Sequence, residues 1–216
     1  MVEGERPGLS IRGRLTDNRS EGNMDPTEFL RGVSALLTPL VEGTDPAQLA
    51  GDTPCEDFTV GDLLGHVTLG RFMFGAGLAG DSERQQELVT TMPARLSDVL
   101  GDDHCATYRR ASADLDCAVE GVADATEMVS LAFGEMAAGD ALRMLAADNY
   151  VHCWDLACAT GQDFAPAPHL TDEAVAFFRS VITDDFRGRG AFGPEIEVSA
   201  DASSFEHLLG FCGRAP

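Results

Sequence analysis

The sequence predicts an all-α protein, an antiparallel helical bundle with additions. Several segments place apolar residues at the three- and four-residue spacing of one helix face, and helix-capping residues stand before them. The chain shows no internal repeats and no alternation of strand and helix patterns. Because 216 residues, 44% of them hydrophobic, can bury a sizeable core, we expect one domain built of packed helices.

Two helices are predicted in the first third of the chain. Asp25 is expected to be an N-cap, followed by a proline in the first turn and by an apolar stripe that runs to Leu40. A second helix is expected after Thr59, which begins a capping-box pattern. This helix should end between Gly75 and Gly80, where glycines gather.

The middle of the chain predicts two more helices. Between residues 80 and 101 the sequence turns polar, after which Asp102 or Asp103 could cap a third helix that reaches about Glu120. The fourth predicted helix is the longest. Asp140 can cap it, and its apolar stripe continues to a glycine at position 161.

The last third predicts shorter elements. After a loop with two prolines, Thr171 opens a fifth helix with a strong apolar stripe. Residues 195–198 alternate in polarity and could form one short extended segment. A final short helix is expected from Ser204 to Phe211.

Charge and composition exclude several classes of function. The chain holds 36 acidic and 15 basic residues, for a formal net charge of −21, and it should therefore repel nucleic acids and anionic membranes. No run of 18 apolar residues exists, so no membrane span is predicted. Residues 1–23 lack both a signal-peptide stretch and any periodicity. We predict a cytoplasmic protein in which residues 1–23 are a disordered leader or a misassigned start, and residues 24–216 form the domain.

The six cysteines suggest reduced thiols. They form no Cys-x-x-Cys pair, and a domain of this size does not need disulfides. We therefore expect them to be mostly buried.

Two of the five histidines fall where they could bind a metal ion. His66 lies on the apolar face of the second predicted helix, and His152 lies on the fourth, one turn after Asp148. Residues four apart lie above one another on a helix, so Asp148 and His152 can converge on one cation. With His66 they would supply three ligands and leave a position open for water or substrate, as in catalytic metal sites. Spacing alone also allows ordinary hydrogen-bonded core residues.

Three segments resemble a known family. Residues 53–67, TPCEDFTVGDLLGHV, resemble the N-terminal motif of metal-binding proteins related to mycothiol-dependent maleylpyruvate isomerase, within the DinB-like superfamily. Residues 151–161, VHCWDLACATG, look like the second motif of this family, which usually reads HGWDLARATG. Residues 202–214 resemble the ending of a short, single-domain branch. The likeness covers about residue 24 to the C-terminus.

The resemblance implies a DinB-like four-helix bundle with a C-terminal helix. It implies a divalent metal ion, expected to be zinc, held by His66, Asp148 and His152. It also implies mycothiol as a cosubstrate. The acidic ligand of the family is usually glutamate, so Asp148, one methylene shorter, is a departure. Cys158 is a second departure, because the family commonly has arginine there.

Other residues near the candidate ligands are expected to have mainly structural roles. Asp155 could accept the N–H of a ligand imidazole, but a structural role is favoured. Trp154 is expected to anchor the bundle, and Cys55 to be a buried structural thiol, although its place ahead of a helix could lower its pKa. Cys153 points about 100° away from His152 and should not join the metal. The remaining histidines are expected at the surface: His104, His169 and His207.

We therefore expect a metal-binding enzyme that transfers a small-molecule thiol to an electrophile or uses it in an isomerisation. A bound divalent cation deprotonates a thiol and holds it in place. The isomerase itself is not expected, because those enzymes carry a further C-terminal domain. The second substrate, the metal and the oligomeric state, monomer or dimer, stay open. The alternatives are a non-catalytic metal-binding or partner-binding bundle, and a bundle without metal.

Overall fold

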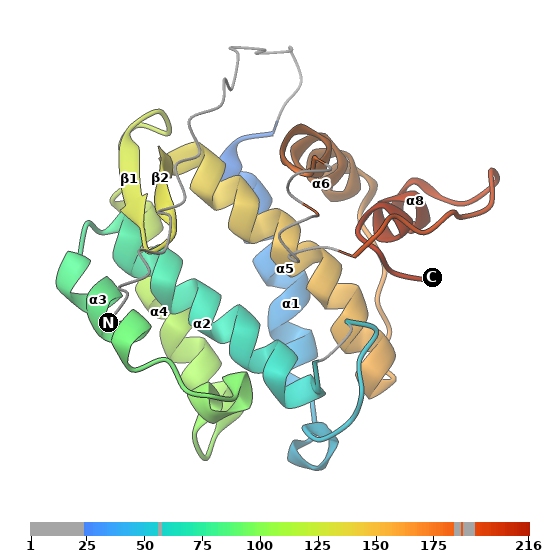
Figure 1. Ribbon diagram of the computed structural model, residues 1–216, viewed down its shortest axis with the longest axis horizontal. Helices are drawn as coiled ribbons and strands as arrows, with labels where there is room; N and C mark the ends of the chain where they lie inside the picture. Colours follow the sequence, from blue (N-terminus) through green and yellow to red (C-terminus); the bar gives the residue numbers. More distant parts are fainter. Residues whose placement is uncertain (1–23, 56–57, 184–186, 188–192) are drawn as a thin grey trace, which may run out of the picture.

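Four long helices form the centre of the protein. The computed structural model describes residues 24–55, 58–183, 187 and 193–216. Helix α1 packs against α4 and α5, and α2 packs against the same two helices, so the four surround one core. Figure 1 shows α2 and α5 running side by side in front of α1 and α4. The predicted all-α four-helix bundle is confirmed, and residues 1–23 lie outside the described part. The bounds are Pro26–Glu42 for α1, Val60–Leu78 for α2, His104–Glu120 for α4 and Ala138–Thr160 for α5.

The core is built from leucines that each of the four helices contributes. Leu37 of α1, Leu64 of α2 and Leu115 of α4 are fully buried, and Leu142 of α5 is 1% exposed. Burying one such side chain contributes about 1.5–3 kcal/mol. The apolar stripes of the sequence therefore meet where their periodicity predicted.

The starts of α1, α2 and α4, each with a capping side chain, were predicted at the right residues. Asp25 accepts hydrogen bonds from the backbone N–H groups of Thr27 and Glu28 at the start of α1. Thr59 and Asp62 form the capping box of α2, and Asp103 caps α4 through Ala106 N–H. These caps satisfy N–H groups that a helix start leaves without partners.

Helix starts without a side-chain cap were predicted too late. Helix α5 begins at Ala138, directly after a strand, so Asp140 lies in its first turn and does not cap it. Helix α6 (Pro168–Val181) begins at its proline rather than at Thr171. The Thr171 hydroxyl instead lies 2.8 Å from the Tyr150 hydroxyl. Helix α5 ends as predicted, with Gly161 in the left-handed conformation at φ 69°.

Several short elements were not predicted. Between α2 and α4 lie helix α3 (Ser82–Thr90) and the 3₁₀ helix η2 (Leu96–Leu100), and an earlier 3₁₀ helix, η1, spans Pro46–Gln48. Helix α3 buries only Gln85 and Leu88, which is too little for an apolar stripe. Strands β1 (Met128–Leu131) and β2 (Gly134–Ala137) form an antiparallel hairpin that leads into α5.

The C-terminal region packs outside the bundle. Helix α6 contacts α5 and α1, and α8 (Ser204–Phe211) packs against α6, as Figure 1 shows. The final helix therefore has the predicted bounds. Residues 195–198 do not form a strand, although Ile196 N–H donates to Gly210 O at 2.9 Å. The extended structure of the described part lies instead in the β1–β2 hairpin.

Two expectations about side chains need correction. Of the six cysteines, only Cys153 and Cys212 are buried, and Cys117 and Cys158 are exposed. His104 is 6% exposed at the start of α4 rather than on the surface, whereas His169 and His207 are exposed. Among the described residues, no helix is both long and apolar enough to cross a membrane.

Candidate metal centre

Two helices of the bundle bring the three predicted ligands together. Helix α2 carries His66, and α5 carries Asp148 and His152 one turn apart. Glycine at position 65 lets α2 lie close to η2, because a Cβ atom there would meet the carbonyl of Leu96 at 2.0 Å. Helix α2 is also anchored by the carboxylate of Asp62, which accepts a hydrogen bond from Ser97 N–H at 3.1 Å.

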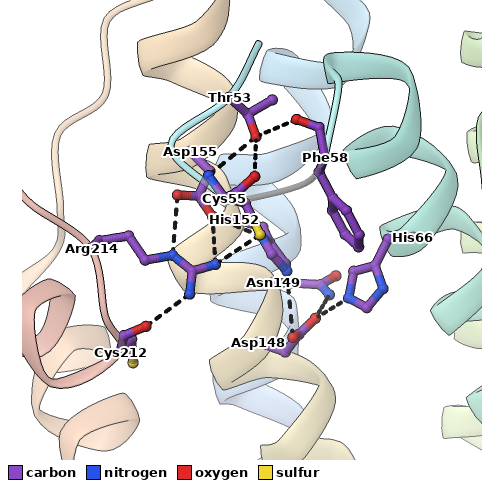
Figure 2. A network of polar contacts seen from close by, with 10 residues as sticks. All are labelled: Thr53, Cys55, Phe58, His66, Asp148, Asn149, His152, Asp155, Cys212 and Arg214. Carbon is purple, nitrogen blue, oxygen red and sulfur yellow. Dashed lines mark hydrogen bonds and ion pairs between the residues drawn. The ribbon is translucent and has the colours of Figure 1, made fainter. Parts of the chain in front are cut away.

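The donor atoms of the three residues face one common centre. His66 Nε2 lies 3.2 Å from Asp148 Oδ2, and His152 Nε2 lies 3.5 Å from Asp148 Oδ1. The two imidazole rings lie 5.0 Å apart at 74°. One ligand atom from each residue lies within 4.8 Å of the others, so the group has the size of a metal site. Figure 2 shows both imidazoles turned toward the Asp148 carboxylate.

The site opens to solvent on one side. The side chains of His66 and Asp148 are 37% and 32% exposed, whereas that of His152 is 7% exposed. Phe58 packs beside His66, with ring centroids 5.6 Å apart, and forms an apolar edge. A small molecule could therefore reach the centre from the His66 side.

The carboxylate and the imidazoles shift one another's pKa values. Burial by itself would raise the pKa of Asp148, but the His152 and His66 imidazoles outweigh burial and hold this pKa well below 3.8. Burial would likewise lower the pKa of His152, but Asp148 and Asp155 raise it to about 9. Without a bound cation, His152 therefore carries the positive charge that the carboxylates attract.

Asp155 supports His152 from the other side of its ring. Its Oδ2 accepts a hydrogen bond from His152 Nδ1 at 2.9 Å, and the Asp155 side chain is fully buried. The sequence favours a structural role for Asp155, but its carboxylate instead accepts hydrogen bonds from the His152 imidazole and from Arg214. This contact fixes the ring so that Nε2 faces Asp148, which is how proteins orient metal-binding histidines.

Arg214, near the C-terminus, was missed by the sequence analysis. Its Nη2 lies 3.1 Å from Asp155 Oδ2, and its Nε lies 3.4 Å from Asp155 Oδ1. It also donates to the Cys55 sulfur at 3.2 Å and to Cys212 O at 2.9 Å. Only the family likeness of residues 202–214 pointed to this segment, and it gave Arg214 no role.

A second arginine, Arg71 of α2, was also missed. Its Nη2 donates to Asn149 Oδ1 at 3.3 Å and to Ser34 Oγ at 3.2 Å, and it lies over the Tyr108 ring. Asn149 Nδ2 in turn donates to Asp148 Oδ2 at 3.3 Å. The available signal was an arginine five residues after His66 in an otherwise apolar helix.

The cysteines and the tryptophan near the three candidate ligands differ in burial. Cys153 is fully buried, and burial raises its pKa well above the usual range, so it is an unreactive core thiol outside the ligand groups. Trp154 is partly buried and packs against the main core. Cys55 is half-buried rather than buried, and Cys158, at the position of the family's arginine, is exposed.

Comparison with known proteins gives the chain its family. Residues 30–157 match the family described as the mycothiol maleylpyruvate isomerase N-terminal domain. Uncharacterized proteins of Mycobacterium tuberculosis strains CDC 1551 / Oshkosh and ATCC 25618 / H37Rv are each 30% identical over 192 residues, 88% of this chain and 98% of theirs.

Solved structures share the fold. The crystal structures of the mycothiol-dependent maleylpyruvate isomerase and of a histidine-to-alanine mutant of it match with a TM-score of 0.55. They are 18% and 17% identical, over 79% of this chain and 73% of theirs. At this identity the likeness concerns the fold. The match to the family over more than half of the chain makes this protein a member of the mycothiol maleylpyruvate isomerase N-terminal domain family.

Proposed function

We propose that the protein binds a divalent metal ion, zinc, through His66, Asp148 and His152, and uses it to activate a small-molecule thiol. The observation that carries this proposal is the convergence of two imidazoles and one carboxylate, with all three donor atoms within 4.8 Å. Nitrogen and carboxylate ligands suit zinc, and three protein ligands with an open fourth position are typical of its catalytic sites.

The donor set fits such an ion. Asp155 accepts the Nδ1 proton of His152, which leaves Nε2 available on the side of Asp148 and His66. The negative charge of Asp148 favours a cation at the centre. Asp148 is shorter than the usual glutamate, but its two oxygens already lie 3.2 Å and 3.5 Å from the two imidazoles, so the shorter side chain reaches the centre.

The chemistry follows from the family and from the open side of the site. A bound zinc ion would deprotonate a coordinating thiol, which is a poor nucleophile in its neutral form. The exposed edge beside His66 and Phe58 would admit the thiol, and the buried His152–Asp155 pair would hold the opposite side rigid. We infer that the thiol is mycothiol and that the reaction is a thiol transfer or a thiol-assisted isomerisation of a small electrophile.

Elemental analysis tests the metal site directly. The purified protein should hold close to one zinc per chain, and His66→Ala and His152→Ala should hold almost none. His207→Ala removes an exposed histidine of α8 and should bind metal as the unchanged protein does. Absence of metal from all four proteins after incubation with zinc and desalting would contradict the proposal.

A thiol assay separates an enzyme from a non-catalytic metal-binding bundle. The zinc-loaded protein is mixed with mycothiol and a panel of electrophiles that includes maleylpyruvate, and thiol consumption is compared with that of the metal-free protein. Faster consumption by the loaded protein, lost in His66→Ala, supports the enzyme. Equal rates would favour the non-catalytic binding bundle. The exposed Cys158, at a position where the family commonly has arginine, also supports that alternative.

A further inference from the structure

Behind the candidate metal centre lies a second group of ligating side chains. Cys55, His152 and Asp155 each offer a donor atom, and these atoms also lie within 4.8 Å of one another. This second group shares His152 with the first, but it meets the ring from the side of Nδ1, which lies 2.9 Å from Asp155. The imidazole of His152 therefore belongs to two groups of three candidate ligands, each of which adds two other side chains.

A cation from the chain itself already occupies the second group. The Arg214 guanidinium contacts both oxygens of Asp155, at 3.1 Å and 3.4 Å, and the Cys55 sulfur at 3.2 Å. Figure 2 shows the Arg214 guanidinium joined by dashed lines to both Asp155 and Cys55, away from the carboxylate of Asp148. Its Nη1 is tied to the carbonyl of Cys212, and the side chain is 11% exposed, so its position is defined.

We propose that Arg214 fills the cation position of the Cys55–His152–Asp155 group and thereby directs metal to the His66–Asp148–His152 group. Arginine stays charged at every physiological pH, and its planar fork matches a carboxylate. A divalent ion in the second group would need the same Asp155 and Cys55 atoms and would lie against a positive charge. The guanidinium therefore excludes it.

The proposal rests in part on the proposed function, since it states which of two groups takes the ion. Thiolate ligands bind zinc strongly, so the group that contains Cys55 would compete for the ion with the group of two histidines and one aspartate. In the second group the metal would take the Nδ1 side of His152 and leave the open centre beside His66. Arg214 thus acts as a specificity-determining residue for the position of the metal.

Replacement of Arg214 should open the second group. The test uses the full chain with cobalt(II), whose spectrum gains a near-ultraviolet charge-transfer band when a thiolate is a ligand. His66→Ala first disables the open centre, and it should weaken cobalt binding by more than about 100-fold, since loss of an outer partner alone costs about 10–100-fold. Adding Arg214→Met to His66→Ala should regain at least about 10-fold of that affinity, together with the thiolate band.

Two matched variants show whether the regained site is the proposed one. Adding Cys55→Ser to the double variant should abolish the band and the regained binding. Combining His66→Ala with Arg214→Lys, which keeps a positive charge, should show neither. A double variant that binds cobalt no better than His66→Ala, or that binds it without a band dependent on Cys55, would overturn the proposal.

The unchanged protein provides a test that needs no variant to fold. Cobalt bound to it should show no thiolate band, because Arg214 holds Cys55, and a band there would also overturn the proposal. Arg214→Gln, which retains hydrogen bonding without the charge, replaces Arg214→Met if the latter unfolds. The His66→Ala series does not need the open centre. Absence of metal from the unchanged protein would therefore contradict the proposed function, whereas absence of cobalt binding at the Cys55–His152–Asp155 group would contradict the proposal for Arg214.

Discussion

Two arginines, the partly buried Arg214 and the buried Arg71, flank the α5 turns that carry Asp148 and His152, and their charges have different surroundings. Arg214 contacts a buried carboxylate, Asp155, with two nitrogens. Arg71 is 1% exposed and, among the described residues, has no carboxylate within 4 Å. Its hydrogen bonds go to neutral groups, Asn149 and Ser34, and its Nε has no hydrogen-bond partner among the described residues.

The difference shows that loss of the Arg214–Asp155 pair and loss of the Arg71 hydrogen bonds should change the free energy of unfolding by different amounts. A buried charge pair is costly to break, because removal of one partner leaves the other charge uncompensated. A buried cation held by amides and an aromatic ring costs desolvation instead, and little is left uncompensated when it is removed. Both arginines nevertheless reach a residue of the proposed metal centre: Arg214 contacts Asp155, which accepts from His152, and Arg71 contacts Asn149, which donates to Asp148.

The largest effect should come from breaking the charge pair. Asp155→Ala leaves Arg214 without its carboxylate and His152 Nδ1 without its acceptor. We expect it to lower the free energy of unfolding by about 3–5 kcal/mol, measured by urea denaturation. Zinc affinity should fall about 10–100-fold in the same variant, measured by competition with a chelator. Asp163→Ala, which removes an exposed aspartate just after α5, should change neither quantity, and an equal loss in both variants would contradict the assignment.

The next effect is a pH dependence of the metal-free protein. The pKa of His152 is raised from 6.5 to about 9 by Asp148 and Asp155, so the folded state holds its proton more tightly than the unfolded state. This stabilisation is complete below pH 6.5 and is lost as the pH rises through about 9. The free energy of unfolding should fall by about 3 kcal/mol over that range.

Urea denaturation at pH 6 and pH 9.5 after chelation measures this loss. His152→Gln should abolish it, whereas His207→Gln should leave it unchanged. Zinc binding near pH 7 should also release close to one proton from His152, detected by calorimetry in buffers of different ionisation enthalpy. A flat stability profile in the unchanged protein would show that His152 is not the proton holder.

The smallest effect should come from the arginine without a carboxylate. Arg71→Met leaves the neutral Asn149 oxygen without its donor but also removes a desolvated charge. We expect unfolding to become easier by only about 1 kcal/mol, with Arg31→Met on the exposed face of α1 as the control. A loss as large as that of Asp155→Ala would show that Arg71 is part of a charge pair in solution.

The parts of the fold that could be predicted are those with local signals. The starts of α1, α2 and α4 could be predicted from their capping residues. These residues accept hydrogen bonds from backbone N–H groups of the first turn: Asp25, Thr59 and Asp103. Helix α5 has no such residue, because strand β2 leads directly into it, and the predicted cap, Asp140, lies three residues after the observed N-cap position at Ala137. Helix α3 and the hairpin bury too few apolar side chains to leave a periodic pattern.

The site divides in the same way. His66, Asp148 and His152 could be nominated because Asp148 and His152 are one helical turn apart and the two histidines lie in segments that resemble family motifs, with Asp148 at the place of the family's usual glutamate. One donor atom from each residue lies within 4.8 Å of the others, and their role as metal ligands stays a prediction. The contacts of Arg214 with Asp155 and of Arg71 with Asn149 could not be predicted. They join residues that are 59 and 78 positions apart in the sequence, so no spacing pattern indicates them.

The sequence by itself determined the helices, their apolar faces and the three side chains that could ligate an ion, because periodicity and capping are local properties of the chain. Only the tertiary structure decided what surrounds those ligands. The C-terminal segment returns Arg214 to Asp155, and α2 brings Arg71 to Asn149. The electrostatic environment of a site depends on distances in space, and these are set by packing between segments far apart in sequence.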